Sequence, residues 1–303
     1  MTTRRSILVI GSVALDSVET PFGKKECVLG GSATYFSISA SFFNKVNIVA
    51  AVGRDFPEKY IRMFKNKGIG TDGLTVSSGK TFKWKGRYRG NLNEAETIYT
   101  HLNVFKDFKP RIPEYLRSSE YIFLANIDPE LQADVLSQAG AAKFVACDTM
   151  NFWILSKKKE LLKVLKKVDL LLLNDSEARM LSGDHNIIRA GKWIISKGPK
   201  MVVIKKGEHG SLFMSKTSCF MAPAFPLESL RDPTGAGDSF AGGMMGSLSR
   251  AGRINESSIR RSIIYGSVTG SFCVEDFSVN RMLRLSRKDI ARRYEKFHKF
   301  TKF

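Results

Sequence analysis

The sequence predicts an α/β protein with one domain over residues 1–303, built on a mostly parallel sheet and carrying a small β appendage. A chain of 303 residues is long enough to bury one large core. Two apolar segments, 6–15 and 168–173, are typical of strands buried in a parallel sheet. The appendage is indicated between residues 80 and 105, where aromatic and basic residues alternate with the period of a strand.

The first third of the chain predicts alternating strands and helices. Asp16 follows the first strand where it leaves the sheet, which is the position at which open α/β folds bind ligands. A simple turn residue is the alternative interpretation of Asp16. The expected elements are a strand over 6–15, one or two short strands within 19–29, a helix over 34–43, a strand over 46–52 and a helix over 58–67.

The rest of the chain continues this alternation without an internal repeat. A hairpin is expected within 80–105, and two short antiparallel strands within 211–225. The other expected strands are 121–125, 143–147, 168–173 and 201–205, and the expected helices are 131–142, 178–181, 241–248, 257–272 and a tail helix from residue 287.

The chain is strongly basic, with a net charge of +19 at pH 7. Such a charge indicates a nucleic-acid partner, attraction of anionic substrates or simply a basic surface. We predict no nucleic-acid partner, because the positive residues are scattered and no recognition motif accompanies them. The alternation in 81–88 also suits single-stranded nucleic acid, but 98–102 offers no matching platform. The densest basic stretch, expected to be a solvated helix face, comprises Arg281, Arg284, Arg287, Lys288, Arg292, Arg293, Lys296, Lys299 and Lys302.

Cysteine and histidine usage indicates neither a disulfide framework nor a metal site. The cysteines lie far apart in mostly apolar or strand-like surroundings, which predicts reduced thiols in a cytoplasmic protein. The first apolar run ends at Asp16 without a small-residue cleavage site, and no run is long enough to span a bilayer. We therefore predict no membrane partner. The four cysteines are Cys27, Cys147, Cys219 and Cys273.

The most informative segment is 232–243, in which a turn runs into a helix of small residues. Gly235 and Gly237 allow the backbone to bend tightly and to approach a ligand. Because the helix begins near Gly237, its unpaired N–H groups and positive dipole end form an anion site. Asp238 is placed to take a proton from a hydroxyl while these N–H groups hold phosphoryl oxygens. The alternative is that Asp238 only caps the helix, but a cap requires neither the two glycines before it nor the Gly-Gly pair after it.

This segment closely resembles the C-terminal signature of the ribokinase-like (PfkB) family of sugar and nucleoside kinases. Every fixed position of the pattern D-x-x-G-A-G-D-x-F is present. The resemblance implies a three-layer α/β/α fold with a small β-lid, and an ATP-dependent kinase that uses Mg²⁺. It also implies that Asp238 is the catalytic base, while the N–H groups of Gly235, Ala236 and Gly237 stabilise the moving phosphoryl group.

Two further segments resemble the nucleotide side of that family. Asn174 and Glu177 match an N-x-x-E motif that positions Mg²⁺ and phosphate through water, although the same spacing suits a capping box. In a later turn, Lys205 or Lys206 is expected to neutralise ATP charge, and Gly207 to border the phosphates. An exposed lysine pair is the alternative.

A D-x-N-x-x-W stretch, with Asp148 and Asn151, resembles one that follows a strand in several sugar kinases. It is expected to shape the floor of the site, and plain turn formation is the alternative for each residue. A monovalent cation near Asp232 is also predicted.

The resemblance further implies an acceptor site at the end of the first strand. Asp16 is expected to hold substrate hydroxyls, while Gly30 and Gly31 let the substrate approach the backbone. Many members carry Asn at the position of Tyr35, so ribose specificity does not transfer. We interpret Tyr35 either as a ring that stacks on the substrate or as a core residue.

The lid implied by the resemblance is formed by about residues 17–30 and 80–106. Trp84, with Phe82 or Tyr88, is expected to cover the substrate. The exposed face of such a lid is expected to pair with its twin in a homodimer.

The predicted function is ATP-dependent phosphorylation of a hydroxyl on a sugar or sugar-like small molecule. A nucleoside, whose base stacks on Tyr35, Phe82 or Trp84, is the alternative acceptor. A non-catalytic basic binding protein with the same fold is a further alternative, disfavoured because Asp238 and the loop glycines are all present.

Overall fold

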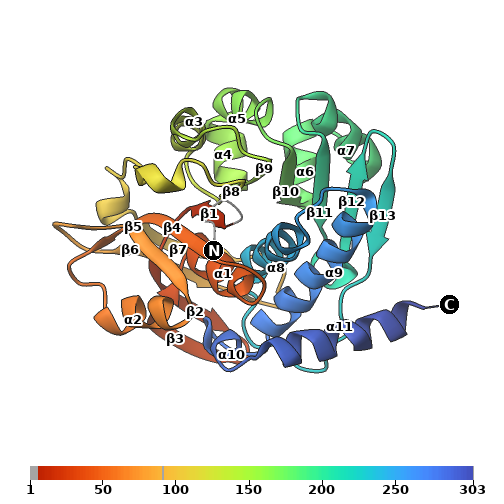
Figure 1. Cartoon of the computed structure of the whole chain (residues 1–303). Coiled ribbons are helices and arrows are strands. Elements are labelled where there is room, and N and C mark those ends of the chain that lie inside the picture. Colours follow the sequence, from red (N-terminus) through yellow and green to blue (C-terminus); the bar gives the residue numbers. More distant parts are fainter. Residues whose placement is uncertain (1–5, 91, 303) are drawn as a thin grey trace.

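The computed structural model describes residues 6–90 and 92–302, and a nine-stranded sheet runs through the molecule (Figure 1). The strand order is β13-β12-β11-β10-β9-β8-β1-β4-β5. All neighbours from β11 to β5 pair in parallel, while β12 and β13 are antiparallel at one edge. The strands are β1 (Ile7–Ile10), β4 (Val46–Gly53), β5 (Ile69–Ser77), β8 (Tyr121–Leu124), β9 (Phe144–Asp148), β10 (Leu170–Asn174), β11 (Met201–Lys205), β12 (Ser211–Ser215) and β13 (Cys219–Ala222).

Helices cover both faces of this sheet, which confirms the predicted α/β/α layers (Figure 1). Alternate strand residues point to opposite faces. Accordingly, Ile7 and Val9 belong to one buried cluster and Leu8 and Ile10 to another. The helices are α1 (Ser32–Ser41), α2 (Glu58–Asn66), α3 (Pro129–Gln138), α4 (Asn151–Ser156), α5 (Lys158–Leu165), α6 (Asp175–Ser182), α7 (Ile187–Ser196), α8 (Ala236–Ala251), α9 (Glu256–Cys273), α10 (Asn280–Leu283) and α11 (Arg287–Thr301).

A second, four-stranded sheet has the order β3-β2-β6-β7. Its strands are β2 (Ala14–Thr20), β3 (Gly23–Gly30), β6 (Phe82–Arg87) and β7 (Glu96–His101). The prediction of one strand over 6–15 is wrong, because β1 ends at Ile10 and Ala14 already pairs with Phe82 in this small sheet. The apolar run misled because residues 11–13, which connect the two sheets, are buried as well.

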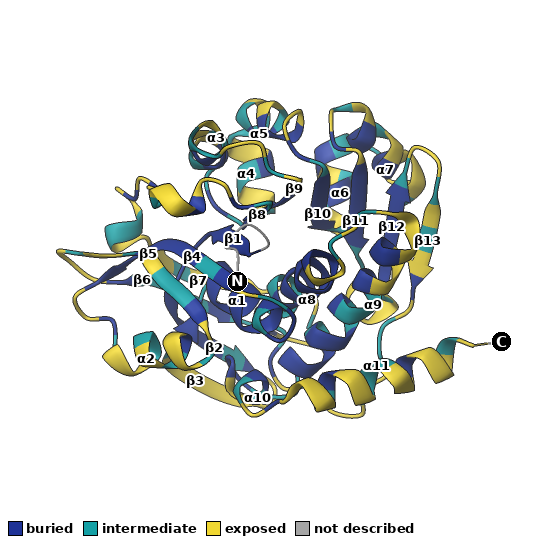
Figure 2. Cartoon of the chain, viewed as in Figure 1, coloured by how far each residue is buried: buried dark blue, intermediate teal, exposed yellow. Residues whose placement is uncertain are grey.

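The small sheet is anchored at one end and free at the other. Both the backbone N–H and the hydroxyl of Thr81 donate to Asp55 Oδ1 at 2.7 Å, which fixes the chain as it enters β6. β3 and β7 form the two edges of this sheet, and residues 21–27 in and before β3 are exposed (Figure 2). Unpaired edge strands invite pairing with another chain.

The Gly-Gly pair after Asp238 serves helix packing. A Cβ atom on Gly242 would stand 2.2 Å from the carbonyl oxygen of Phe36 in α1. A Cβ atom on Gly243 would stand 2.1 Å from Oγ1 of Thr269 in α9. The small residues therefore let α8 approach both neighbouring helices closely, and this fixes where the N-terminus of α8 lies.

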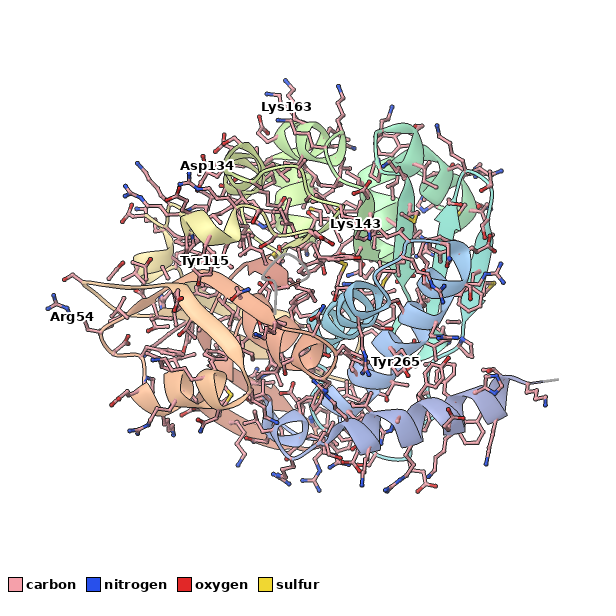
Figure 3. The ribbon with its side chains drawn as sticks, viewed as in Figure 1. Arg54, Tyr115, Asp134, Lys143, Lys163 and Tyr265 are labelled. Atoms are coloured by element: carbon pink, nitrogen blue, oxygen red, sulfur yellow. The ribbon has the colours of Figure 1, made fainter. Side chains whose placement is uncertain are left out.

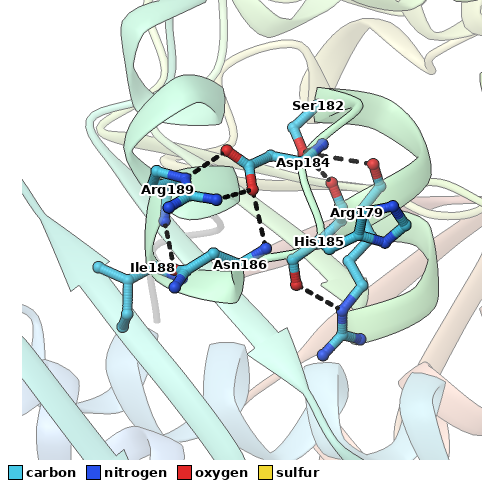
Figure 4. A network of polar contacts seen from close by, with 8 residues as sticks. Arg179, Ser182, Asp184, His185, Asn186, Ile188 and Arg189 are labelled. Atoms are coloured by element: carbon cyan, nitrogen blue, oxygen red, sulfur yellow. Dashed lines mark hydrogen bonds and ion pairs between the residues drawn. The ribbon is translucent and has the colours of Figure 1, made fainter.

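The sequence did not predict β5 or the helices α4, α5, α7 and α10. α7 begins at a well-formed cap next to the end of α6 (Figure 4). Asn186 Oδ1 accepts from the backbone N–H groups of Ile188 and Arg189, at 3.0 and 3.1 Å. Arg189 also pairs with Asp184, which holds the loop between the two helices. The signals for α7 are a short polar cap and an ion pair, which are weaker predictors of a helix than a long apolar pattern.

The C-terminal helix α11 packs along α9. Tyr265, which faces α11 in Figure 3, stacks on Tyr294 with ring centroids 4.3 Å apart. Arg293, predicted to lie on a solvated face, is instead half-buried and pairs with Glu275. Most other basic residues of this tail are exposed. Within residues 6–90 and 92–302, no helix combines the length and apolar character needed to cross a bilayer.

Candidate active site

Three polar residues stand side by side at the carboxyl ends of neighbouring strands. Asp148 ends β9, Asn174 ends β10 and Lys205 ends β11. The register pairs Asp148 with Leu172 and Lys205 with Asn174, so all three lie at one edge of the sheet. Open α/β sheets bind ligands at this edge.

The first turn of α8 lies against Lys205. A Cβ atom on Gly237 would stand 3.0 Å from Lys205 Nζ. The N-cap residue Gly235 has a φ of 76°, and a Cβ atom there would stand 2.3 Å from the ring of Tyr35. Glycine is therefore required at 235 by both backbone conformation and space. The Ala236 N–H donates to the carbonyl oxygen of Pro233 at 3.1 Å, and the first turn of α8 that follows lies beside the Lys205 ammonium, an arrangement that suits phosphate.

Asp238 lies in this first turn and is half-buried. Burial, with a smaller contribution from Asp148, raises the pKa of Asp238 to about 7, against the opposing effect of Lys205. A carboxylate with a pKa near neutrality is suited to accept a proton from a hydroxyl. The capping alternative is wrong, because Gly235 is the N-cap residue and makes no side-chain cap.

Asp16 lies in β2 and is 4% exposed. Its Oδ2 accepts from the backbone N–H of Gly31 at 3.3 Å, and a Cβ atom on Gly30 would stand 1.8 Å from the same oxygen. The structure thus brings these three predicted residues together. Burial, followed by the nearby carboxylates of Asp232 and Asp238, raises the pKa of Asp16 to about 7.

Asn174 and Glu177 form a capping box at the start of α6. Asn174 Oδ1 accepts from the Glu177 backbone N–H, and Glu177 Oε2 accepts from the Asn174 backbone N–H, both at 2.7 Å. Burial raises the pKa of Glu177 to about 7, although Lys205 opposes this effect. No group of three or more His, Cys, Asp or Glu side chains in the described residues is arranged to bind a metal. Carboxylate and amide oxygens such as those of Glu177 and Asn174 are of the type that Mg²⁺ prefers in proteins.

Tyr35 lies in α1, and only 2% of it is exposed. Its ring fills the space above Gly235, as the close approach described above requires. Its hydroxyl has no hydrogen-bond partner among the described residues. Burial raises the pKa of Tyr35 well above its usual value, and the carboxylates of Asp232 and Asp16 add to this effect. These observations favour the interpretation of Tyr35 as a core residue that supports the phosphate turn.

Trp84 lies directly opposite Asp16 in the parallel pair of β6 and β2. Register partners in such a pair project to the same face. The indole is half-buried, and its Nε1–H donates to Thr97 Oγ1 at 3.2 Å. Phe82 instead packs against Phe105, with ring centroids 5.6 Å apart. Trp84 therefore shares its register position with Asp16, while its indole leans over Gly86, where a Cβ atom would stand 2.1 Å from the ring, and toward Thr97 of β7.

The small sheet and its loop also contact the turn before α8 and the turn after β11, which the sequence did not predict. Thr234 Oγ1 donates to the hydroxyl oxygen of Tyr88 at 3.2 Å. A Cβ atom on Gly207 would stand 2.1 Å from Asn93 Oδ1, so the loop between β6 and β7 reaches the turn after β11. No local pattern could reveal these contacts, because the partners lie more than a hundred residues apart.

Lys205 forms a buried ion pair with Asp148. Its Nζ lies 3.0 Å from Asp148 Oδ2, and the two side chains are only 17% and 5% exposed. The alternative of an exposed lysine pair is therefore wrong for Lys205. Each residue was singled out by its motif, but their pairing follows only from the strand order β9-β10-β11.

Comparison with known proteins gives matches over most of the chain. Residues 5–284 match the model of the pfkB family carbohydrate kinases. A cytidine kinase of Thermococcus kodakarensis is 29% identical over 82% of this chain and 91% of its own length.

Solved structures share the fold. The nucleoside kinase of Methanocaldococcus jannaschii, an archaeal member of the ribokinase family, has a TM-score of 0.78 and 21% identity, covering 98% of this chain and 100% of its own. An E. coli structure of the ribokinase II type, in complex with ATP and Mg²⁺, has a TM-score of 0.79 and 17% identity, covering 96% and 99%.

Proposed function

The chain belongs to the pfkB family of carbohydrate kinases, and we propose that its acceptor is a nucleoside. It is an ATP-dependent phosphotransferase that acts on a sugar or nucleoside. The observation that carries the proposal is the position of Trp84 directly opposite Asp16. An aromatic face beside a carboxylate suits a molecule in which a flat base is joined to a polyol. Similarity to a cytidine kinase supports the same class of acceptor.

We propose that Asp238 is the catalytic base. It takes the proton of the acceptor hydroxyl, whose oxygen forms a bond to the γ-phosphorus while the bond from that phosphorus to the ADP oxygen breaks. The N–H groups of Gly235, Ala236 and Gly237 hold the oxygens of the group in transfer. Asp16 accepts hydrogen bonds from the other hydroxyls of the acceptor.

Mg²⁺ is proposed to bind with ATP, where it would neutralise phosphate charge. Glu177 and Asn174 would hold it through water, since the described residues offer no larger set of metal ligands there. Gly207 is proposed to border the phosphates.

A monovalent cation is proposed beside the loop that contains Asp232. The Asp232 carboxylate accepts from the backbone N–H groups of Thr234 at 2.9 Å and Ser278 at 3.1 Å, so it organises the approach to α8. Comparing activity in potassium with activity in a bulky organic cation at equal ionic strength tests this site. Equal rates in the two salts would contradict it.

The small sheet is proposed to act as the lid and to form a homodimer through its free edge. Support comes from the exposed part of β3 and from Phe22, an exposed apolar residue in the turn just before it. Light scattering coupled to gel filtration measures the mass, and a monomer at micromolar concentration would contradict the dimer. We also propose a cytoplasmic location, which the four free cysteines support.

The function is tested by measuring ADP release from Mg·ATP with matched panels of nucleosides and free sugars. We expect at least one nucleoside to be used with a higher kcat/KM than every sugar. The D238N variant supplies the background of ATP hydrolysis. Turnover confined to free sugars would overturn the nucleoside acceptor and favour the sugar alternative.

A further inference from the structure

A buried charge pair at the edge of the site is not used by the proton transfer. Asp148 and Lys205 lie 3.0 Å apart with little exposure to solvent. Withdrawing two charges from water costs free energy that a single ion pair repays poorly. The pair is therefore better explained by a task for the ammonium group than by stability.

The surroundings of Lys205 indicate that task. Its Nζ lies against Gly237, in the helix turn proposed to hold the group in transfer. Burial lowers the pKa of Lys205, but the carboxylates of Asp148, Glu177 and Asp238 together outweigh this effect, so the pKa is raised and the ammonium stays charged. A permanent cation beside the N-terminal turn of a helix suits the outermost phosphate of ATP.

Asp148 fixes where this ammonium stands. Its Oδ1 accepts from the Thr149 backbone N–H at 2.8 Å, which leaves Oδ2 for Lys205. The carbonyl oxygen of Asp148 accepts from the buried side chain of Gln132 at 3.1 Å. The carboxylate is therefore held by the Thr149 N–H and the backbone of Asp148 by α3, while the lysine is a long, flexible side chain that needs such an anchor.

We infer that Lys205 binds the γ-phosphate of ATP and distinguishes ATP from ADP, and that Asp148 is the positioning residue that holds its ammonium against Gly237. This inference deepens the proposed function by assigning recognition of the phosphoryl donor. The role of Lys205 concerns nucleotide binding alone and does not depend on which acceptor is used.

The experiment measures the affinities for Mg·ADP and for Mg with a non-hydrolysable ATP analogue by calorimetry, without acceptor. The D148N/K205M double variant removes both charges together and leaves no unpaired buried ion. We expect it to lose about 10- to 100-fold in affinity for the analogue, the usual worth of a charge-assisted hydrogen bond, while ADP affinity stays within about twofold. K216M, which removes an exposed lysine at the opposite end of the β11–β12 pair, is the matched control and should retain the wild-type ratio.

The D148N single variant tests whether Asp148 positions the Lys205 ammonium or only balances its charge. With its anchor gone, Lys205 is free to turn toward Glu177 or Asp238, and the preference for the analogue over ADP should fall, though less than in the double variant. A preference equal to or above that of the wild type would show that Asp148 is only a counter-charge. A double variant that keeps the wild-type ratio, or that weakens both nucleotides equally, would overturn the role of Lys205. These binding results remain valid whichever acceptor the kinetic screen finds.

Discussion

Trp84 and Asp16 lie directly opposite each other on β6 and β2, with their side chains on the same face of the small sheet. One offers an apolar ring face and the other a carboxylate that hydrogen-bonds to Gly31. The two thus present complementary chemistry at neighbouring points. A free sugar needs only the carboxylate, whereas a nucleoside engages both.

The first prediction concerns Trp84. We expect W84A to lower kcat/KM for nucleosides by about 5- to 150-fold, because stacking of a base is worth about 1–3 kcal/mol. Activity toward a free sugar should change little. Y99A is the matched control, since Tyr99 pairs with Lys85 in the register and lies on the opposite face of the small sheet. Equal losses for nucleosides and sugars would show that Trp84 does not select the acceptor.

The second prediction concerns Tyr35. Its hydroxyl has no partner among the described residues, so Y35F should leave the free energy of unfolding unchanged or raise it by up to about 1 kcal/mol. Y35A should lower it by about 3–5 kcal/mol, the usual cost of deleting a buried ring, and should lower kcat because Gly235 loses its support. Urea denaturation and steady-state kinetics measure the two effects. A Y35A variant of wild-type stability would contradict the core interpretation.

The third prediction concerns Asp238. We expect D238N to keep the fold and to lower kcat by about 10²–10⁴-fold, the usual worth of a positioned base. Circular dichroism and thermal unfolding check the fold, and D134N, at an exposed position on α3, serves as the control. Near-normal turnover in D238N would remove Asp238 from the role of base.

The fourth prediction concerns the net charge of +19. The charge is spread over many elements, and Lys163 of α5, for example, points into solvent (Figure 3). We expect fluorescence anisotropy to give dissociation constants no tighter than about 10⁻⁶ M for DNA or RNA at physiological salt. Tighter binding with a steep salt dependence would show that nucleic acid is a partner.

Much of the fold could be predicted because its signals are local. The apolar runs of β10 and β11, the glycines at 30 and 31, and the turn before α8 each stand within a few residues of one another. The predicted cluster of Asp16, Gly30 and Gly31 also lies together in the structure, as does that of Asn174 and Glu177.

The rest depends on which strands become neighbours. The Lys205–Asp148 pair needs the order β9-β10-β11, and the approach of Asn93 to Gly207 needs the small sheet to reach across the site. Neither is encoded in a local pattern. The burial of Tyr35 likewise follows from how closely α8 packs on α1. The glycines of α8 permit this close packing, but their presence in the sequence does not predict it.

The fifth prediction concerns the dependence of activity on pH. Asp238 must be ionised to accept a proton, and its pKa is raised to about 7, so kcat/KM should fall as the pH is lowered through about 7. Asp148 contributes to this raised pKa and Lys205 opposes it. D148N should therefore shift the fall in kcat/KM to lower pH, and K205M should shift it to higher pH. A nonspecific loss of structure would shift it in the same direction in both variants. Rates that stay level down to pH 5 would rule out a base with a raised pKa.

The raised pKa of Asp238 also determines the direction in which the free energy of unfolding changes with pH. Between its ordinary pKa of 3.8 and about 7, the Asp238 carboxyl binds more protons in the folded state than in the unfolded state. The free energy of unfolding should therefore contain a contribution that is present below about pH 4 and is lost as the pH rises through 7. Asn at position 238 does not titrate, so urea denaturation of D238N at pH 5 and pH 8 should show a smaller decrease than the wild type. An identical decrease in the two proteins would show that Asp238 titrates with the same pKa in the folded and unfolded chain.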